Sequence, residues 1–304
     1  MTQPTIRAAH NAIDTTRFAP FEHEFSVHPS MTMPALQALA HRLEPTGQCR
    51  HISPAATQAS AFDHQPAATD GRGLDEVFDQ IDQPGAWLAL YNVETDPEYA
   101  AFLAQVRTEF EPLIAQQRTG LKNLGGFIFI SCAPSVTPFH IDRENNFWLQ
   151  IQGRKTISVW PANDPDVIDH ETAEKFILNR DLANVTLQDS IRPLQHDLDM
   201  TPGKGLYFPC LAPHMTRCDS TTDDGQPIPS ISVGVVFYSD QTQHQARVLA
   251  CNRLLRRGGL HPRPPQIIRS GERAPIRDRV KAAAGMAAVR LMSRLRDYSA
   301  PPGL

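Results

Sequence analysis

The sequence has few cysteines, and they form no pattern that indicates a disulfide framework. Its five cysteines among 304 residues are scattered, odd in number and never spaced as CxxC. Such usage is typical of thiols that stay reduced in the cytoplasm. The chain also lacks a basic-then-apolar signal pattern and any apolar run near the roughly 18 residues of a membrane-spanning helix. We therefore expect a soluble cytoplasmic protein.

An excess of charge of one sign is also missing, since the formal net charge is only −4. The charges are nevertheless unevenly distributed. The segment 247–297 holds thirteen Lys and Arg residues against three Asp and Glu, which leaves about −14 on the remainder. There are no internal repeats, and the length suits either two domains or one larger β-barrel enzyme. This uneven distribution indicates that the basic C-terminal segment interacts with a negatively charged partner.

Short strands separated by turns dominate the middle of the chain. We predict strands near 87–93, 126–132, 137–142, 146–151, 154–160, 193–199, 205–209, 213–218 and 230–238. Helical spacing of apolar residues predicts helices at 34–43, 74–81, 97–117, 171–180, 241–257 and 275–297. The polar stretch 53–73 is expected to be a loop. This order predicts a mainly β protein with a closed or double-sheet core and flanking helices.

A possible metal site lies in the stretch 137–155, which reads TPFHIDRENNFWLQIQGRK. His140 and Asp142 are two apart on a predicted strand, so their side chains leave the same face about 7 Å apart. An HxD pair alone is a weak signal, because so short a motif recurs by chance. A second histidine, His214, follows in PGKGLYFPCLAPH. Two His and one carboxylate with open positions are typical of non-haem Fe(II) oxygenases, and they also suit catalytic zinc.

Two other histidines compete with His214 for the third ligand position. His196 shares a strand face with Leu194 and Leu198 in LQHDLDM, and such a histidine is more often a core residue. His244 stands at a polar helix start, where we expect it to be solvated. His214 is favoured because it follows a turn-rich run that would bring it back to the core.

Lys155 is the second unusual feature of this stretch. Strand alternation places Lys155 on the apolar face with Ile157 and Val159, opposite Arg154 and Thr156. A lysine is rarely buried without a partner, because desolvating its ammonium group is costly. No acidic residue lies nearby on that face, so a bound anion would supply the counter-charge. The alternative is that the side chain extends to the barrel rim.

The stretch 125–161, GGFIFISCAPSVTPFHIDRENNFWLQIQGRKTISVWP, resembles the core of the JmjC and cupin-like Fe(II)/2-oxoglutarate oxygenases. It is particularly similar to asparaginyl hydroxylases of the factor-inhibiting-HIF type. The resemblance implies a double-stranded β-helix in which His140, Asp142 and His214 bind Fe(II). It also implies that Thr137 and Lys155 hold the distal carboxylate of the cosubstrate 2-oxoglutarate. Looser similarity covers 200–238.

The resemblance places Asn146 near the cosubstrate as well. On the last core strand, where the related hydroxylases carry another asparagine that contacts the cosubstrate, this chain reads SISVGVVF. Ser232 or Gly234 stands near that position, and Ser232 is the candidate binding residue. The chain then divides into an N-terminal mixed region (1–120), the JmjC-like core (121–240) and a basic helical segment (241–304).

These features together predict an Fe(II)- and 2-oxoglutarate-dependent oxygenase. It would consume O2, hydroxylate a protein side chain or a small metabolite, and release succinate and CO2. One alternative is a zinc or manganese hydrolase, which leaves an inward Lys155 without a role. A different class is a non-catalytic metal-binding cupin that senses a small molecule.

The last predicted helix also points to a partner. Apolar residues recur along it at helical spacing: Val280, Ala284, Ala287, Leu291, Leu295 and Tyr298. C-terminal helices often pair two subunits in the related oxygenases, so we predict a homodimer through this stripe. Packing against the chain's own barrel is the simplest alternative, and nucleic-acid binding by the basic residues is another.

Overall fold

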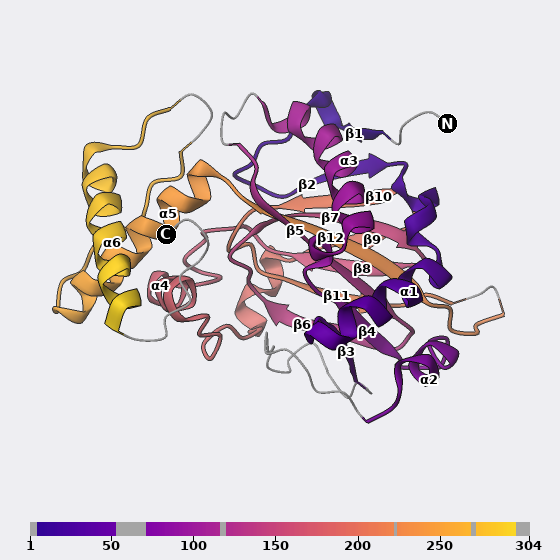
Figure 1. The fold of residues 1–304 in the computed structure, drawn as a ribbon. Helices are drawn as coiled ribbons and strands as arrows, with labels where there is room; N and C mark the ends of the chain where they lie inside the picture. Colours follow the sequence, from indigo (N-terminus) through magenta and orange to yellow (C-terminus); the bar gives the residue numbers. More distant parts are fainter. Residues whose placement is uncertain (1–4, 53–70, 116–119, 222–223, 269–271, 296–304) are drawn as a thin grey trace.

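The computed structural model describes residues 5–52, 71–115, 120–221, 224–268 and 272–295. Their strands form two antiparallel sheets with helices on the outside (Figure 1). The eight-stranded sheet has the order β1 (Ile6–Ala8), β2 (Ala19–His23), β10 (Lys204–Phe208), β7 (Asn145–Gln152), β12 (Ser230–Tyr238), β5 (Lys122–Ser131), β4 (Trp87–Leu90) and β3 (Cys49–Ile52). The four-stranded sheet has the order β6 (Ser135–His140), β11 (His214–Cys218), β8 (Lys155–Val159) and β9 (His196–Met200).

The predicted mainly β core with flanking helices is confirmed. Every helix expected from apolar periodicity is present: α1 (Met33–Leu43), α2 (Leu74–Asp79), α3 (Pro97–Ile114), α4 (His170–Asn179), α5 (Asp240–Arg257) and α6 (Ile276–Leu295). The sequence did not predict β1, β2 and β3. These short strands lie at or next to the two edges of the sheet, and three to five apolar or polar residues without a turn signal on both sides did not stand out as strands. The expected loop at 53–73 lies mostly outside the described residues.

Alternation along the eight-stranded sheet separates two layers. On β7, Phe147, Leu149 and Ile151 pack with residues of α1 and α3 in the main apolar core. The alternate residues Asn146 and Trp148 line a cavity between the sheets instead. Because strand neighbours point to opposite faces, one sheet can build a helix-covered core and a site wall at once.

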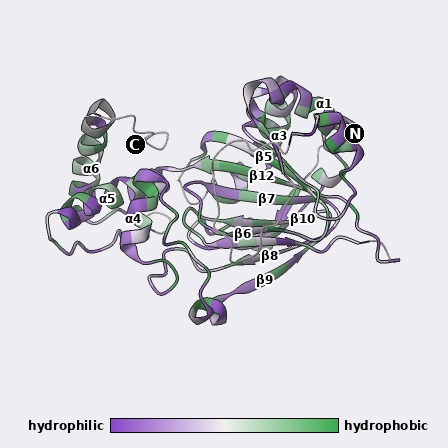
Figure 2. Ribbon diagram, turned by 90° about the horizontal axis from the view of Figure 1, so that it is seen from below, coloured by the Kyte–Doolittle hydropathy of each residue, from purple (hydrophilic) through white to green (hydrophobic). Residues whose placement is uncertain are grey.

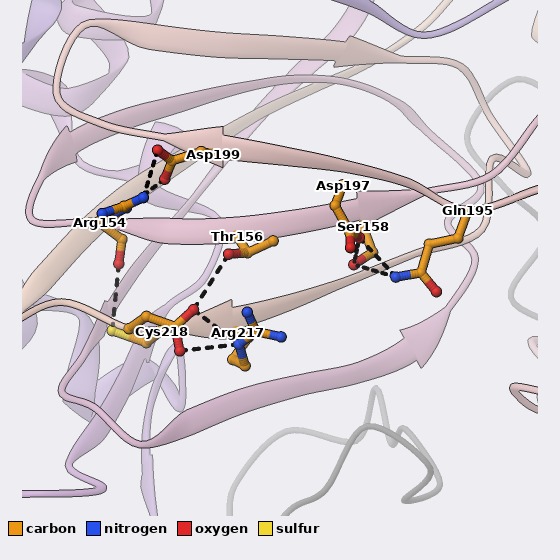
Figure 3. A network of polar contacts seen from close by, with 9 residues as sticks. Arg154, Thr156, Ser158, Gln195, Asp197, Asp199, Arg217 and Cys218 are labelled. Carbon is orange, nitrogen blue, oxygen red and sulfur yellow. Dashed lines mark hydrogen bonds and ion pairs between the residues drawn. The ribbon is translucent and has the colours of Figure 1, made fainter. Parts of the chain in front are cut away.

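The outer face of the four-stranded sheet is polar (Figure 3). Arg154 forms an ion pair with Asp199 at 2.6 Å, and Ser158 donates to Asp197 at 2.6 Å. Thr156 lies on the same face and donates to Asp219. Since these residues of the 154–159 run point outward, the intervening Lys155, Ile157 and Val159 point inward, as the alternation predicted.

Gly205 allows β10 to pass close to β2. A Cβ at this position would lie 2.2 Å from the ring of Phe21, which is buried and packs edge-on against Phe110 and Phe147. We therefore expect Gly205→Ala to lower the free energy of unfolding by about 1–3 kcal/mol, as overpacking does. Urea unfolding measures the change. Gly73→Ala is the control, because nothing lies within 4 Å of its Cβ, and an equal loss there would contradict the expectation.

Helices α4, α5 and α6 group together on one side of the sheets (Figures 1 and 2). Helix α6 packs against α5 through Ala282, Gly285 and Val289, and a Cβ on Gly285 would lie 2.0 Å from the carbonyl oxygen of Arg247. The apolar stripe that the sequence predicted on this helix, which begins at Val280, is therefore not the face that packs against α5. Val280 on that stripe is 63% exposed. The alternative prediction, that the stripe packs against the chain's own barrel, is therefore wrong for Val280.

No described helix has both the length and the apolar character needed to cross a membrane. The proposed division at residues 120 and 240 stays a prediction. The strands β1 to β4 of the first segment nevertheless join the same eight-stranded sheet as β5, β7, β10 and β12.

Candidate active site

The three predicted metal ligands converge between the two sheets. His140 ends β6, and His214 begins β11 directly opposite it in the strand pairing. One ligand atom from each of His140, Asp142 and His214 lies within 4.8 Å of the other two. The Nε2 atoms of His140 and His214 are 4.0 and 3.5 Å from the Asp142 carboxylate oxygens. Donor atoms that each lie about 2.0–2.2 Å from one metal ion are separated from one another by distances close to these two. This cluster can therefore bind a metal ion.

Asp142 is positioned differently from the expectation. The sequence predicted it on the same strand as His140, but β6 ends at His140. The backbone carbonyl of Asp142 instead accepts a hydrogen bond of 2.9 Å from the N–H of Leu211. Leu211 has a φ of 64°, a left-handed conformation that residues with a Cβ rarely adopt. This bond ties the segment that carries Asp142 to the segment that leads into His214.

Backbone carbonyls orient both imidazole rings. Nδ1 of His140 lies 2.7 Å from the Pro138 carbonyl oxygen, and Nδ1 of His214 lies 3.0 Å from that of Ala212. A carbonyl can only accept, so each Nδ1 carries the proton and each Nε2 presents its lone pair. Such outer hydrogen bonds fix the tautomer that a metal requires. The two rings are therefore prepared as nitrogen donors on the side facing Asp142.

The cluster lines a cavity of about 690 Å³. This volume is within the range of small-molecule and cofactor sites. Walls come from both sheets, including Phe127 and Phe129 of β5, Trp148 of β7, and Thr216 of β11. The cavity is thus large enough for a cosubstrate beside the metal and for part of a second molecule.

Lys155 is buried in the wall of this cavity. It is 3% exposed, and its Nζ donates to Ser232 Oγ at 3.1 Å. It forms no ion pair with any residue that the structure describes. Burial lowers the pKa of its ammonium group from the usual 10.5 to about 8. The alternative that Lys155 extends to the barrel rim is wrong, and an anion in the cavity would supply the missing counter-charge.

The other predicted cosubstrate residues line the same cavity. Thr137 of β6, Asn146 of β7 and Ser232 of β12 all contribute to its wall. Asn146 is 6% exposed, and its Oδ1 is buried without a hydrogen-bond partner among the described residues. A Cβ on Gly234 would lie 3.3 Å from the Asn146 amide, so this glycine leaves room for that side chain. An unsatisfied amide oxygen and a buried lysine in the wall of one cavity form the kind of site that a polar ligand completes.

Residues 115–239 match the JmjC domain family model. The matched segment contains the three candidate metal ligands together with Thr137, Asn146, Lys155 and Ser232. This segment is a JmjC domain. Fe(II) and 2-oxoglutarate are the cofactors of JmjC oxygenases, and the donor set fits both: two imidazoles and a carboxylate suit Fe(II), and a buried ammonium suits a dicarboxylate.

Solved structures resemble the chain at low sequence identity. The X-ray structure of Escherichia coli YcfD shares 17% identity over 90% of this chain and 64% of that chain, with a TM-score of 0.46. The chain thus spans slightly less than two thirds of that protein. A non-haem alpha-ketoglutarate-dependent carbocyclase of nogalamycin biosynthesis, SnoK, shares 16% identity over 75% of this chain and 81% of that chain, with a TM-score of 0.44. No curated protein sequence matches the chain.

Two residues next to the JmjC domain's HxD motif, Arg143 and Glu144, lie in the wall of the cavity. Arg143 is only 3% exposed, and its guanidinium donates to the carbonyl oxygen of Phe176 at the end of α4. Glu144 is half-buried, lines the cavity and accepts a short hydrogen bond from the hydroxyl of Tyr238. Burial and the negative charge of Asp142 raise the pKa of Glu144. Helix α4 thus holds Arg143 in the wall of the site, and Tyr238 of β12 holds Glu144 there.

The competing histidines lie away from the metal cluster. His196 on β9 is exposed, and its ring centre lies 5.0 Å from the ring centre of Phe18. The expectation of a core histidine is therefore wrong. Its neighbours Leu194 and Leu198 are themselves only half-buried. His244 is half-buried on α5, and burial lowers its pKa, whereas the sequence predicted a solvated residue.

Several cavity residues had no signal in the sequence. Arg50 and Tyr91 come from β3 and the end of β4, far from the HxD motif, and reach the cavity because both strands extend the eight-stranded sheet. Arg180 follows α4 and lines the cavity with an exposed side chain. Tyr238 ends the apolar strand β12. A polar aromatic residue at the end of such a strand was the one feature of the sequence that could have indicated its place in the cavity.

Proposed function

We propose that this protein is an Fe(II)- and 2-oxoglutarate-dependent oxygenase that hydroxylates a protein side chain or a small metabolite. One observation carries the proposal: the cavity that contains the His140, Asp142 and His214 cluster also contains Lys155, a buried cation without an acidic partner. A metal site alone serves many functions, but the added buried cation selects an anionic cosubstrate. All five cysteines are free, in keeping with the reducing cytoplasm in which we place the protein.

The residues of the chain have distinct tasks in this reaction. His140, Asp142 and His214 would hold the metal on one side and leave its other positions open. Lys155 and Thr137 would bind the distal carboxylate of 2-oxoglutarate. When bound, Fe(II) and 2-oxoglutarate supply the oxidising chemistry, which consumes O2 and releases succinate and CO2 as an oxygen atom enters the substrate.

The apolar part of the cavity has a separate task. Trp148 and Phe129 stand in the wall near these groups, where they exclude water from the reacting centre. Exclusion of water also strengthens the attraction between Lys155 and a carboxylate, because the local dielectric constant is low.

Two other functions compete with this proposal. A zinc or manganese hydrolase could use the same three ligands, but it has no use for a buried Lys155. A metal-binding sensor of the cupin type would bind a small molecule in this cavity without converting it to a product. Iron-loaded protein incubated with 2-oxoglutarate and O2 separates the three, because oxygenases often release succinate slowly without their prime substrate. Iron-dependent succinate supports the proposal, and its absence from freshly reconstituted protein would refute it.

The affinity for 2-oxoglutarate should depend on the protonation of Lys155. Burial lowers the pKa of this residue to about 8 in the free protein, and only the charged form attracts a carboxylate. The dissociation constant should therefore be flat below pH 8 and rise by up to about tenfold per pH unit above it. Calorimetric titration of Mn(II)-loaded protein measures this curve. Lys155→Met should show weak binding without the bend, and a wild-type curve that is flat to pH 10 would contradict the assignment.

The proposal extends to a homodimer through α6. Ile276 and Val280 are 77% and 63% exposed, and the small residues Ala284 and Ala287 on the same side are exposed too. Apolar side chains on one exposed helix face gain free energy when a second copy covers them. The basic residues of the segment could then meet the acidic remainder of the partner.

Sedimentation tests this dimer. The wild type should sediment as a dimer and Val280→Asp as a monomer. Val27→Asp should remain a dimer, because Val27 is equally an exposed apolar residue, at 85%, but lies outside α6. A wild-type monomer that binds duplex DNA with an affinity falling steeply with salt would favour nucleic-acid binding by the segment instead.

A further inference from the structure

The loop between β10 and β11 leads directly into the metal ligand His214. It comprises residues 209–213, and a proline at each end leaves it only three backbone N–H groups, those of Cys210, Leu211 and Ala212. One of them, that of Ala212, bonds within the loop. The other two bond to residues outside it, so the N–H groups attach the loop to the rest of the protein at two points.

Asn145, the first residue of β7, accepts one of these two bonds. The residue is 2% exposed, and its Oδ1 accepts a hydrogen bond of 3.1 Å from the N–H of Cys210. Its Nδ2 donates to the carbonyl oxygen of Phe237 on β12 at 3.4 Å. A backbone N–H can only donate and a carbonyl can only accept, so these two partners fix which end of the amide faces the loop. The hydroxyl of Tyr207 also donates to this Oδ1, at 3.3 Å.

The second bond attaches the loop to another metal ligand. The N–H of Leu211 donates to the backbone carbonyl of Asp142 at 2.9 Å, and Asp142 precedes Asn145 by only three residues. Farther along the loop, the carbonyl oxygen of Ala212 accepts from Nδ1 of His214 at 3.0 Å. The loop therefore contacts both Asp142 and His214, and Asn145 holds it from the eight-stranded sheet.

The shape of the loop needs this support. Leu211 has a φ of 64°, a conformation that costs free energy for any residue with a Cβ and persists only where the surroundings hold it. An ionised aspartate in place of Asn145 would accept from Cys210 but has no proton for the Phe237 carbonyl. An apolar residue would leave both backbone groups buried without a partner. The amide of Asn145 meets both groups at once.

We propose that Asn145 is a positioning residue of the metal centre: through the loop 209–213 it holds Asp142 and His214 at the spacing that a metal ion requires. The proposal rests on the ligand assignment of the proposed function. Asn145 then sets the affinity for the metal, although it is not a ligand itself. An asparagine that only joined β7 to β12 would affect stability and leave the metal affinity unchanged.

Calorimetric titration of the metal-free protein with Mn(II) measures this affinity without relying on turnover. Asn145→Ala and Asn145→Leu should weaken Mn(II) binding by about 10- to 100-fold, which is typical of the loss of a partner that orients metal ligands. The visible absorption of bound Co(II) should change as well, because it responds to the arrangement of the donor atoms. Wild-type affinity and a wild-type Co(II) spectrum in the folded variants would refute the proposal.

Gln150→Ala is the matched control on the same strand. Gln150 is fully buried, and its side chain donates to Ser230 Oγ of β12 at 2.8 Å and to the Gln152 carbonyl oxygen. It therefore joins β7 to β12 as Asn145 does, but its side-chain hydrogen bonds do not go to the loop. Its replacement should lower the free energy of unfolding in urea and keep the Mn(II) affinity within about twofold. An equal loss of affinity in this control would contradict the assignment.

Amide hydrogen exchange of the metal-free wild type is an independent measurement that needs no variant. A loop that is held before the metal binds should show slow exchange of the Cys210 and Leu211 N–H groups, as buried hydrogen-bonded amides do. Exchange as fast as that of the exposed Gly225 would refute the proposal even if no Asn145 variant folds. A wild type that binds neither Mn(II) nor Fe(II) would instead refute the ligand assignment on which the proposed function depends.

Discussion

Replacing His214 with alanine is expected to reduce succinate formation by more than about 100-fold. Loss of an outer partner of a metal ligand typically costs 10- to 100-fold in affinity or activity, so loss of the ligand itself should cost more. The structure places His214 Nε2 3.5 Å from the Asp142 carboxylate, and no other described His, Cys, Asp or Glu joins the cluster to replace it. His140→Ala and Asp142→Ala should have effects of similar size.

His196→Ala is the matched control for this experiment. His196 is an exposed histidine on β9, which is separated from β11 by β8 in the same sheet, and its ring contacts only Phe18 among the described aromatic rings. Its replacement should leave succinate formation within about twofold of the wild type, since surface substitutions are usually mild. Full activity in His214→Ala together with loss in His196→Ala would contradict the ligand assignment.

Lys155→Met should weaken 2-oxoglutarate binding by about 10- to 150-fold. A charge-assisted contact contributes roughly 1.5–3 kcal/mol, and methionine keeps the apolar stem without the charge. The same substitution should leave the free energy of unfolding of the free protein equal or higher, because it removes a desolvated cation that has no acidic partner. Calorimetric titration and urea unfolding measure the two quantities.

This opposite effect on binding and stability distinguishes a binding lysine from a structural one. Lys204→Met, on the exposed start of β10, is the control and should change neither quantity appreciably. A Lys155→Met protein that binds 2-oxoglutarate normally would mean that the ammonium group serves Ser232 alone.

Local patterns in the sequence were sufficient for Lys155 and for the three candidate metal ligands. Strand alternation placed Lys155 on the inner face, and the HxD spacing together with the turn-rich approach to His214 indicated three groups that the structure brings within 4.8 Å. These predictions depend on neighbours in the chain, which a sequence displays. The helices followed from apolar periodicity for the same reason.

Contacts between distant segments were not predictable in this way. The strands β1 to β3 are short and exist because β2, β10 and β4 pair with them. The orientation of Glu144 depends on Tyr238 of the last core strand, nearly a hundred residues later, whose hydroxyl donates a hydrogen bond to its carboxylate. The position of Asp142 depends on a hydrogen bond from Leu211, nearly seventy residues later, in a conformation that no local pattern indicates.

Anaerobic titration of the Fe(II)-loaded protein with 2-oxoglutarate is the most direct test of the central claim. A 2-oxo acid that chelates Fe(II) in a site of two imidazoles and one carboxylate gives a visible charge-transfer absorption. The account predicts a saturable band with one equivalent of Fe(II) per chain, lost in Asp142→Ala and shifted to higher 2-oxoglutarate concentrations in Lys155→Met. A wild-type protein that binds Fe(II) but develops no such band at any 2-oxoglutarate concentration would contradict it.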